Sequence, residues 1–230
     1  MQLFERVNVL PLGSGAIAGS PFNINRKRLA ELLDFQEISR NSMNVVADRD
    51  FVVEFNFICT LISTHLSRLS EDCILFSTKE FSFIKISSEY ATGSSLMPQK
   101  YNADSLEIVR GTTGSIFGQL ANMLMTLKGL PSTYNKDLQV DKQSMFLVFD
   151  NMMLSINVIR GVIQTMTVNE ENCRKALSFD MLATDLAYYL VRKEVPFRDA
   201  HHCASLVVDY ATKNNMEVDK VPLKALKDIS

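Results

Sequence analysis

The stretch from residue 93 to residue 105, GSSLMPQKYNADS, combines side chains that could act on an anionic substrate. Two serines follow its glycine, and Lys100 and Asn102 come shortly after them. A lysine, amide donors and the N-terminus of a following helix together favour binding of a carboxylate or a phosphate. Alternatively, the serines are turn residues, Lys100 is solvated, and Glu107 only pairs with Asp104 to cap that helix. The loop taken alone leaves both interpretations open.

A second polar segment, KGLPSTYNKDLQVDK at residues 128–142, separates two long apolar patterns. Its hydrogen-bonding side chains are Ser132, Thr133, Tyr134, Asn135, Lys136, Gln139 and Lys142. A connection of this kind between two bundle helices is a common place for a binding site. The second segment therefore favours the functional interpretation of the first.

Composition excludes several classes of protein. The chain has 230 residues, of which 47% are hydrophobic and 22% charged, as in a folded protein with a sizeable core. The net charge of -2, without a polybasic run, argues against nucleic acid or an anionic membrane as a partner. The four cysteines form no CxxC pair and the three histidines have no metal-ligand spacing, so we expect no metal site and no cofactor.

The sequence also lacks the usual marks of export. We find no uninterrupted apolar run of 18 residues, and the first residues have neither the basic region nor the apolar region of a signal peptide. Widely spaced cysteines fit free thiols in a reducing compartment. We therefore expect a cytoplasmic protein that does not enter a membrane.

Apolar residues recur at helical spacing in three long segments, which predicts an all-α protein. Between residues 50 and 69 these positions are Phe51, Phe55, Ile58, Ile62 and Leu69. His65 falls where the stripe would continue. We interpret it as a helix histidine in or beside a packing seam, not as a catalytic residue. A second helix is predicted over residues 106–128.

The third segment, residues 145–166, has the most regular pattern. Its apolar positions, spaced alternately by four and three, are Met145, Phe149, Met152, Ile156, Ile159, Ile163 and Met166. This is the period of long helices that pack nearly parallel in a bundle. We interpret the methionines as core residues rather than as a binding surface. A stripe of this length would leave a large apolar surface on a monomer, so we expect an oligomer.

The first part of the chain has less regular structure. Residues 8–25 are rich in glycine, proline and asparagine, which predicts a loop, and a helical pattern begins at about residue 26. Residues 78–87, TKEFSFIKIS, are weakly strand-like.

From residue 173 onward the pattern predicts two shorter helices. Ser178 or Asp180 is the expected N-cap of the first, and Pro196 interrupts the pattern before the second. We therefore predict a central helical-bundle domain over residues 1–170, which carries the loop at 93–105, and a small C-terminal helical subdomain over residues 171–230.

Several segments resemble one enzyme family. GSSLMPQK with Asn102 resembles the signature loop of the fumarase/aspartase superfamily. LMTLKGLPSTYNKDLQ and LSFDMLATDLAYYLVRK resemble argininosuccinate lyase and its crystallin relatives, as do NVLPLGSGAIAG and NSMNVVADRDFVVEF. The resemblance covers essentially the whole chain. Tyr134, Gln139 and Lys142 in their context favour argininosuccinate lyase over fumarase, aspartase or adenylosuccinate lyase.

The resemblance implies a long-helix bundle and reversible β-elimination of argininosuccinate to arginine and fumarate. By motif match, Ser94 is the base that removes a proton beside a carboxylate, and Lys100 stabilises the dianion that results. Glu107 matches the residue that the family pairs with an acid histidine. The residues matched to substrate binding are Asn102, Tyr134, Gln139 and Lys142.

The chain departs from the family pattern in several places. His65, His201 and His202 do not lie in the context of the acid histidine. We expect that this chain lacks the family's N-terminal part, which carries that histidine, and some C-terminal residues. Three single positions also differ: Tyr101 replaces a second lysine, Ala103 a proline and Val140 an acidic residue.

Family enzymes are homotetramers in which several subunits contribute to each active site. The resemblance therefore implies a homotetramer, or a hetero-oligomer with full-length subunits. The alternative to an active lyase is a catalytically inactive truncated homologue with a crystallin-like structural role or a role as a partner subunit. A superfamily lyase with another succinyl substrate is a third hypothesis, against which the segment from Tyr134 to Lys142 argues.

Overall fold

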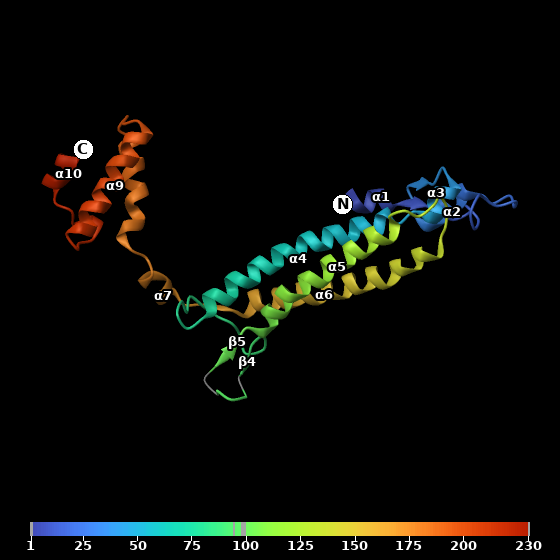
Figure 1. Ribbon diagram of the computed structural model, residues 1–230, viewed down its shortest axis with the longest axis horizontal. Coiled ribbons are helices and arrows are strands. Elements are labelled where there is room, and N and C mark those ends of the chain that lie inside the picture. Colours follow the sequence, from blue (N-terminus) through green and yellow to red (C-terminus); the bar gives the residue numbers. More distant parts are fainter. Residues whose placement is uncertain (1, 94, 98–99, 230) are drawn as a thin grey trace. The chain divides into compact units, whose positions relative to one another are not determined.

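The computed structural model describes residues 2–93, 95–97 and 100–229, and about 65% of the chain is helical (Figure 1). The chain divides into two compact units, residues 1–168 and residues 169–230. Each unit has its own hydrophobic cluster. The predicted all-α class is confirmed.

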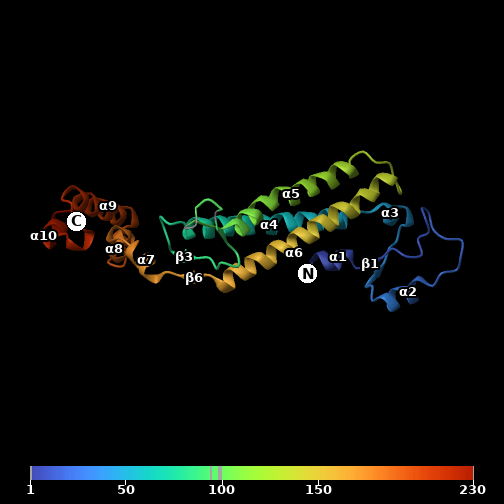
Figure 2. The same ribbon diagram turned by 90° about the horizontal axis from the view of Figure 1, so that it is seen from below.

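Three long helices form the body of the first unit: α4 (Asp50–Ser77), α5 (Asp104–Leu127) and α6 (Asp141–Thr165). They lie side by side, with α5 running opposite to α4 and α6 (Figures 1 and 2). The predicted helices at 50–69, 106–128 and 145–166 are thus confirmed, and the first extends eight residues further. By length and composition, the stretch Lys136–Thr165 could also cross a membrane, a test that bundle-core helices pass as well.

The buried seam of the three helices combines large apolar residues, which include all the buried residues of α5, with small or polar side chains on α4 and α6. On α4 the buried residues are Val52, Asn56, Cys59, Ser63, Ser70 and Cys73. On α6 they are Asp141, Ser144, Val148, Met152, Ser155, Ile159, Gly161 and Val162. Asn56 Nδ2 donates to Ser144 Oγ at 3.0 Å, and Ser144 Oγ donates to the Gln119 carbonyl at 3.2 Å, which joins all three helices.

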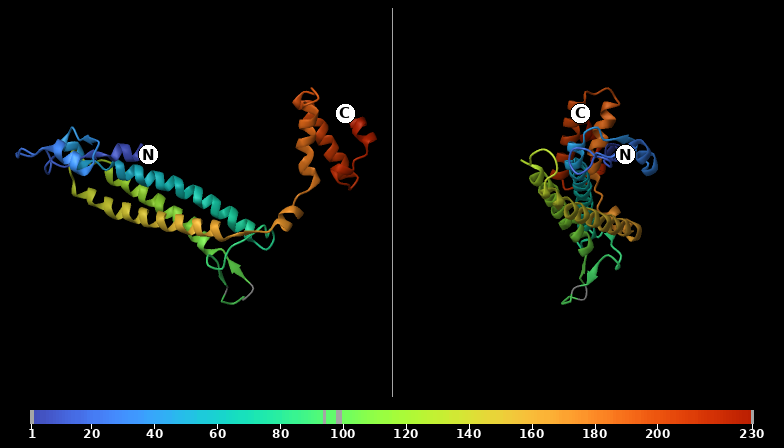
Figure 3. Two further views of the ribbon diagram at one scale, coloured as in Figure 1. Left: turned by 180° about the vertical axis from the view of Figure 1, so that it is seen from behind. Right: turned by 90° about the vertical axis from the view of Figure 1, so that its right-hand side faces the viewer.

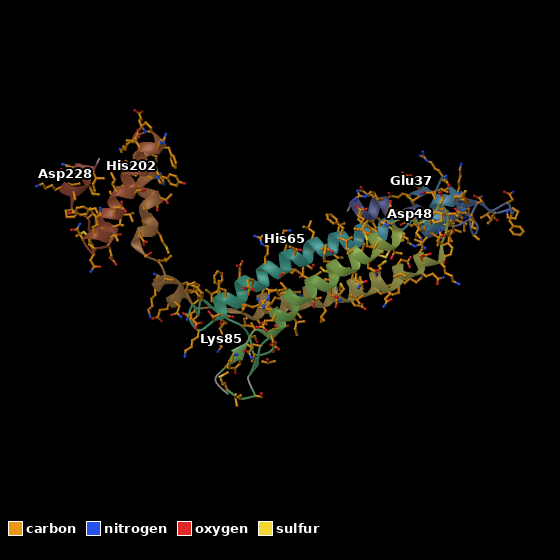
Figure 4. The ribbon with its side chains drawn as sticks, in the orientation of Figure 1. Glu37, Asp48, His65, Lys85, His202 and Asp228 are labelled. Carbon is orange, nitrogen blue, oxygen red and sulfur yellow. The ribbon has the colours of Figure 1, made fainter. Side chains whose placement is uncertain are left out.

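The predicted apolar stripes coincide with this seam only in part. On α6, Met152 and Ile159 are buried, but Phe149 is 50% exposed and Ile156 is 41% exposed. On α4 the buried row is displaced by one residue from the predicted one, because small residues allow the helices to approach closely. Several large apolar residues of the predicted rows, such as Phe51 on α4 and Phe149 on α6, are exposed instead. His65 is exposed on the outer side of α4, so its predicted place at a packing seam is wrong within this chain (Figure 4).

Before α4 the chain forms short elements around an ordered loop. These are α1 (Gln2–Val7), β1 (Val9–Leu10), α2 (Arg26–Leu33), β2 (Glu37–Ile38) and α3 (Ser42–Ala47). Strands β1 and β2 pair in parallel. The predicted loop is held by Arg26, whose guanidinium donates to the Leu12 carbonyl at 3.0 Å and to Ser39 Oγ at 2.6 Å.

Two further strand pairs lie at the far end of the bundle. Strand β3 (Ile84–Lys85) pairs with β6 (Thr167–Val168), so only two residues of the strand-like stretch form a strand. Strand β4 (Thr92–Gly93) pairs with β5 (Tyr101–Asn102) as the base of a hairpin. Figure 3 shows this hairpin at the end of the bundle opposite the N-terminal segment.

The second unit is built from short helices. They are α7 (Glu170–Lys175), the 3-10 helix η2 (Phe179–Leu182), α8 (Ala183–Val191), α9 (Phe197–Lys213), η3 (Val218–Lys220) and α10 (Leu223–Ile229). Pro196 lies between α8 and α9, as predicted, and is the N-cap of α9. Ser178 is the N-cap of η2, which leads into α8, so the predicted cap position is confirmed, although its side chain makes no capping hydrogen bond.

Candidate functional site

The first group of predicted site residues lies on and after the hairpin. Its strands pair Thr92 with Asn102 and Gly93 with Tyr101. Lys100 is exposed, and its backbone amide donates to the Met97 carbonyl at 3.0 Å. Ser94 lies outside the described residues. The structure therefore brings Lys100 and Asn102 together on the second arm of the hairpin.

The two arms are joined to α5 at its first turn. Asp104 Oδ1 accepts a hydrogen bond from the Thr92 amide at 3.1 Å, and Ser105 Oγ donates to the Tyr90 carbonyl at 2.5 Å. The expected capping pair of Asp104 and Glu107 is wrong. The N-cap is Ala103, and Asp104 is already inside the helix, where its carboxylate bonds the opposite arm.

Glu107 lies in the first turn of α5 and is exposed. The described hairpin arm and this turn therefore present a lysine, an amide and a carboxylate at one end of the bundle.

The second group lies between α5 and α6. The 3-10 helix η1 (Lys136–Val140) carries Gln139, whose Nε2 donates to Tyr134 Oη at 3.1 Å. Lys142 Nζ lies 3.4 Å from Asp141 Oδ1, and the lysine side chain is 67% exposed. These three predicted residues therefore gather at the start of α6.

Two interactions that the sequence did not reveal hold this second group. Asn135 Nδ2 donates to the Pro131 carbonyl at 3.2 Å and to the Thr133 carbonyl at 3.1 Å. Thr133 has a φ of 70°, which is unfavourable for a β-branched residue and so needs such support. Arg49, the N-cap of α4, donates from Nε to Asp141 Oδ2 at 2.5 Å. No local motif signals a pair of residues 92 positions apart.

A cavity of about 870 Å³ lies beside the Arg49–Asp141 pair. Its apolar wall includes Phe51, Phe55 and Met145. The residues of this wall come from α4 and α6, and further lining comes from the segment before α4. The cavity is therefore at the same end of the bundle as Tyr134, Gln139 and Lys142.

The two groups are at opposite ends of α5 (Figure 1). This helix has 24 residues, which at 1.5 Å per residue is about 36 Å. One substrate the size of two joined amino acids cannot reach both ends. A single chain therefore does not bring the predicted site residues into one site.

The histidines and cysteines do not add a third group. His201 and His202 are neighbours on α9 and both are exposed. Within the described part of the chain, no three His, Cys, Asp or Glu side chains lie close enough to hold a metal ion. Burial raises the pKa of the Cys59 thiol to about 11, so Cys59 is a poor nucleophile.

Comparison with known proteins identifies the family. The family model described as Lyase matches residues 1–118, about half of the chain, and the model described as Argininosuccinate lyase C-terminal matches residues 180–230. The chain belongs to the lyase family. Within that family its similarity is to the argininosuccinate lyases, whose C-terminal model it also matches.

Individual relatives agree with this placement in the lyase family. Over 99% of its length the chain is 51% identical to a probable argininosuccinate lyase of Schizosaccharomyces pombe, and 49% identical to argininosuccinate lyase of Candida albicans. The chain covers 50% and 49% of those proteins, so it spans about half the length of the curated relatives it matches.

Solved lyase structures share the fold. A variant of EDDS lyase with bound fumarate matches 99% of the chain with a TM-score of 0.83 and 29% identity, and the match covers 46% of that enzyme. A class II fumarase of Schistosoma mansoni matches with a TM-score of 0.74 at 17% identity, which shows the fold alone. Both matches support the long-helix bundle of the fumarase/aspartase type.

Proposed function

We propose that this chain takes part in the argininosuccinate lyase reaction, the reversible β-elimination of argininosuccinate to arginine and fumarate. The observation that carries the proposal is that side chains matched to the family's site occur at both ends of the bundle. Lys100, Asn102 and Glu107 are at one end, and Tyr134, Gln139 and Lys142 are at the other.

The elimination chemistry belongs to the group at the hairpin end. A base takes the proton from the carbon beside a carboxylate, which leaves a dianion on that carboxylate. Elimination then breaks the bond from the neighbouring carbon to the guanidino nitrogen, and an acid returns a proton to that nitrogen. In this proposal Ser94 is the base and Lys100 stabilises the dianion.

The second group is suited to holding the substrate. The bond from Gln139 to the Tyr134 hydroxyl fixes both side chains, and Lys142 supplies an exposed positive charge for a carboxylate. Fixing these groups before the substrate arrives lowers the entropy cost of binding.

Because the two groups are about 36 Å apart along α5, each site in this proposal combines the hairpin end of one chain with the Tyr134 end of another. The outward apolar residues of the bundle support such an assembly. Phe117 is 58% exposed, Phe149 is 50% exposed and Ile156 is 41% exposed, more than a lone bundle would leave in water. We propose a homotetramer, or an assembly with longer subunits, in the cytoplasm.

One observation favours the alternative, an inactive homologue that serves as a structural or partner subunit. The family's acid histidine has no counterpart among the described residues near Glu107, since His65 is exposed on the outer side of α4 (Figure 4). A chain without that acid depends on another subunit to protonate the leaving nitrogen.

The first test is fumarate release from argininosuccinate by the purified chain alone, followed by ultraviolet absorbance. A steady rate that Ser94→Ala abolishes supports an active lyase. A rate equal to background rules out catalysis by this chain alone and favours the partner-subunit alternative. The control variant is Arg28→Met, because Arg28 is far from both groups in the sequence and forms an exposed ion pair.

A further inference from the structure

A glycine in the last part of α6 has a specific neighbour. Gly161 is buried four residues before the end of the helix. A β-carbon there would overlap the hydroxyl and Cζ of Tyr90 and lie 2.8 Å from Cε1. The glycines of α5, which are Gly111, Gly114 and Gly118, have open space in the same test. Glycine within a helix is unfavourable relative to alanine, so Gly161 is explained by the ring packed against it.

Tyr90 in turn stands at the base of the hairpin. Its amide donates to the Ser87 carbonyl at 3.0 Å, and its carbonyl accepts from Ser105 Oγ at 2.5 Å. Two residues later, the Thr92 amide donates to Asp104 Oδ1 at 3.1 Å. One residue therefore joins three parts of the structure: α6 through its ring, the start of α5 through its carbonyl, and the first hairpin arm through the chain.

The surroundings of the ring make this contact rigid. Tyr90 packs against a buried cluster that includes Leu106 of α5 and Ile159 and Val162 of α6. A tyrosine ring has few rotamers and cannot shorten, so it cannot stay in this position if a methyl group occupies the place of the Gly161 hydrogen. The ring must swing out of the cluster, which removes the contact that holds the Tyr90 backbone against α6.

We propose that Tyr90, packed against Gly161, is a positioning residue that sets the hairpin relative to the bundle and thereby sets where Lys100 and Asn102 lie. The structural role of Tyr90 depends only on its contacts with α6, with the start of α5 and with the hairpin arm. The consequence for turnover rests on the proposed function.

Hydrogen exchange with mass spectrometry tests the structural role without requiring activity. We expect Gly161→Ala to accelerate exchange about tenfold or more in peptides containing the Tyr90 and Thr92 amides, because the bonds of both amides depend on the seated ring. Peptides from the centre of α5 should be unchanged. Gly114→Ala is the matched control, since it adds the same methyl group to a helix where nothing opposes it.

A double-mutant comparison identifies the cause. In a Tyr90→Leu background, Gly161→Ala should produce no further acceleration, because the ring that it displaces is absent. The inference is overturned if Gly161→Ala behaves like Gly114→Ala, or if its effect is the same with and without the ring. If Gly161→Ala does not fold, Tyr90→Leu decides: acceleration confined to the hairpin peptides supports the inference, and acceleration throughout the bundle overturns it.

Turnover supplies a separate readout. In any preparation that releases fumarate, Gly161→Ala should lower kcat while Gly114→Ala leaves it unchanged. Altered hairpin exchange in a preparation with no turnover would count against the proposed function and not against the role of Tyr90.

Discussion

Removing Arg49 should destabilise the bundle much more than removing an exposed arginine. Arg49 Nε lies 2.5 Å from Asp141 Oδ2, and the two side chains are only 15% and 10% exposed. The pair joins the N-terminus of α4 to the first residue of α6. In Arg49→Met the buried Asp141 carboxylate loses this partner and keeps its contact with Lys142 Nζ, at 3.4 Å on a largely exposed side chain.

The size of the effect follows from these contacts. Breaking a buried ion pair by removing one partner costs about 3–5 kcal/mol, and the remaining Lys142 contact reduces this to roughly 2–4 kcal/mol. Arg28→Met is the control, because Arg28 and Glu31 are 62% and 64% exposed and such pairs contribute about 0–1 kcal/mol. Asp141→Asn keeps the shape and one acceptor, so we expect a loss between the two.

The assay is urea unfolding followed by circular dichroism of the helices, with the single variant Asp141→Leu and the double variant Arg49→Met/Asp141→Leu completing a cycle. If the uncompensated carboxylate causes the loss, the double variant should be more stable than Arg49→Met alone, because it removes the unpaired charge. A loss in Arg49→Met no larger than in Arg28→Met would refute the reasoning. A double variant with the sum of both single losses would refute it equally.

Three further predictions concern the polar connection, the thiols and the outer face. Asn135→Ala should weaken argininosuccinate binding about tenfold in calorimetry, with helix content unchanged. Adding Thr133→Gly to the same chain should restore part of the affinity, because glycine adopts the positive φ of residue 133 without the Asn135 hydrogen bonds. An unchanged affinity would contradict this role. Burial raises the pKa of the Cys59 thiol from 9.0 to about 11, so iodoacetamide at pH 8 should modify the half-buried Cys203 well before Cys59. The free energy of unfolding should also fall as the pH rises from 9 towards 11, because in that range only the unfolded chain releases the Cys59 proton. Equal modification rates in mass spectrometry would contradict the burial. Ile156→Glu, on the outward face of α6, should lower the sedimentation mass of the assembly while circular dichroism stays the same, and an unchanged mass would show that this face is not an interface.

The positions of the long helices were predictable, but the side of each helix that faces the chain's own core was not. Large apolar residues such as Phe149 and Ile156 dominate the pattern of α6, yet both point outward. The seam itself uses Ser144 and Ser155, which carry no hydrophobic signal. Periodicity shows that a helix has an apolar face, but a helix that packs on two sides has two such faces. The pattern does not say which of them is buried within the chain.

The candidate site shows the same division. Tyr134, Gln139 and Lys142 were predicted as site residues because their motif is local, and so were Lys100 and Asn102; these roles stay predictions. The two groups are separated by the length of α5. This separation follows from the structure, in which the helix is continuous from Asp104 to Leu127. Local propensity also misplaced the cap of α5, because Asp104 bonds the Thr92 amide across the hairpin instead.

The most direct test of a site shared between chains is fumarate release from argininosuccinate by a mixture. This chain would be combined with the longer Schizosaccharomyces pombe relative in which the residue aligned with Ser94 has been replaced by alanine. We predict that the inactive relative regains a rate when this chain is added, because the chain supplies the hairpin end of the site. Ser94→Ala in this chain should abolish the gain. A mixed assembly that forms in sedimentation but releases no fumarate would contradict a shared site.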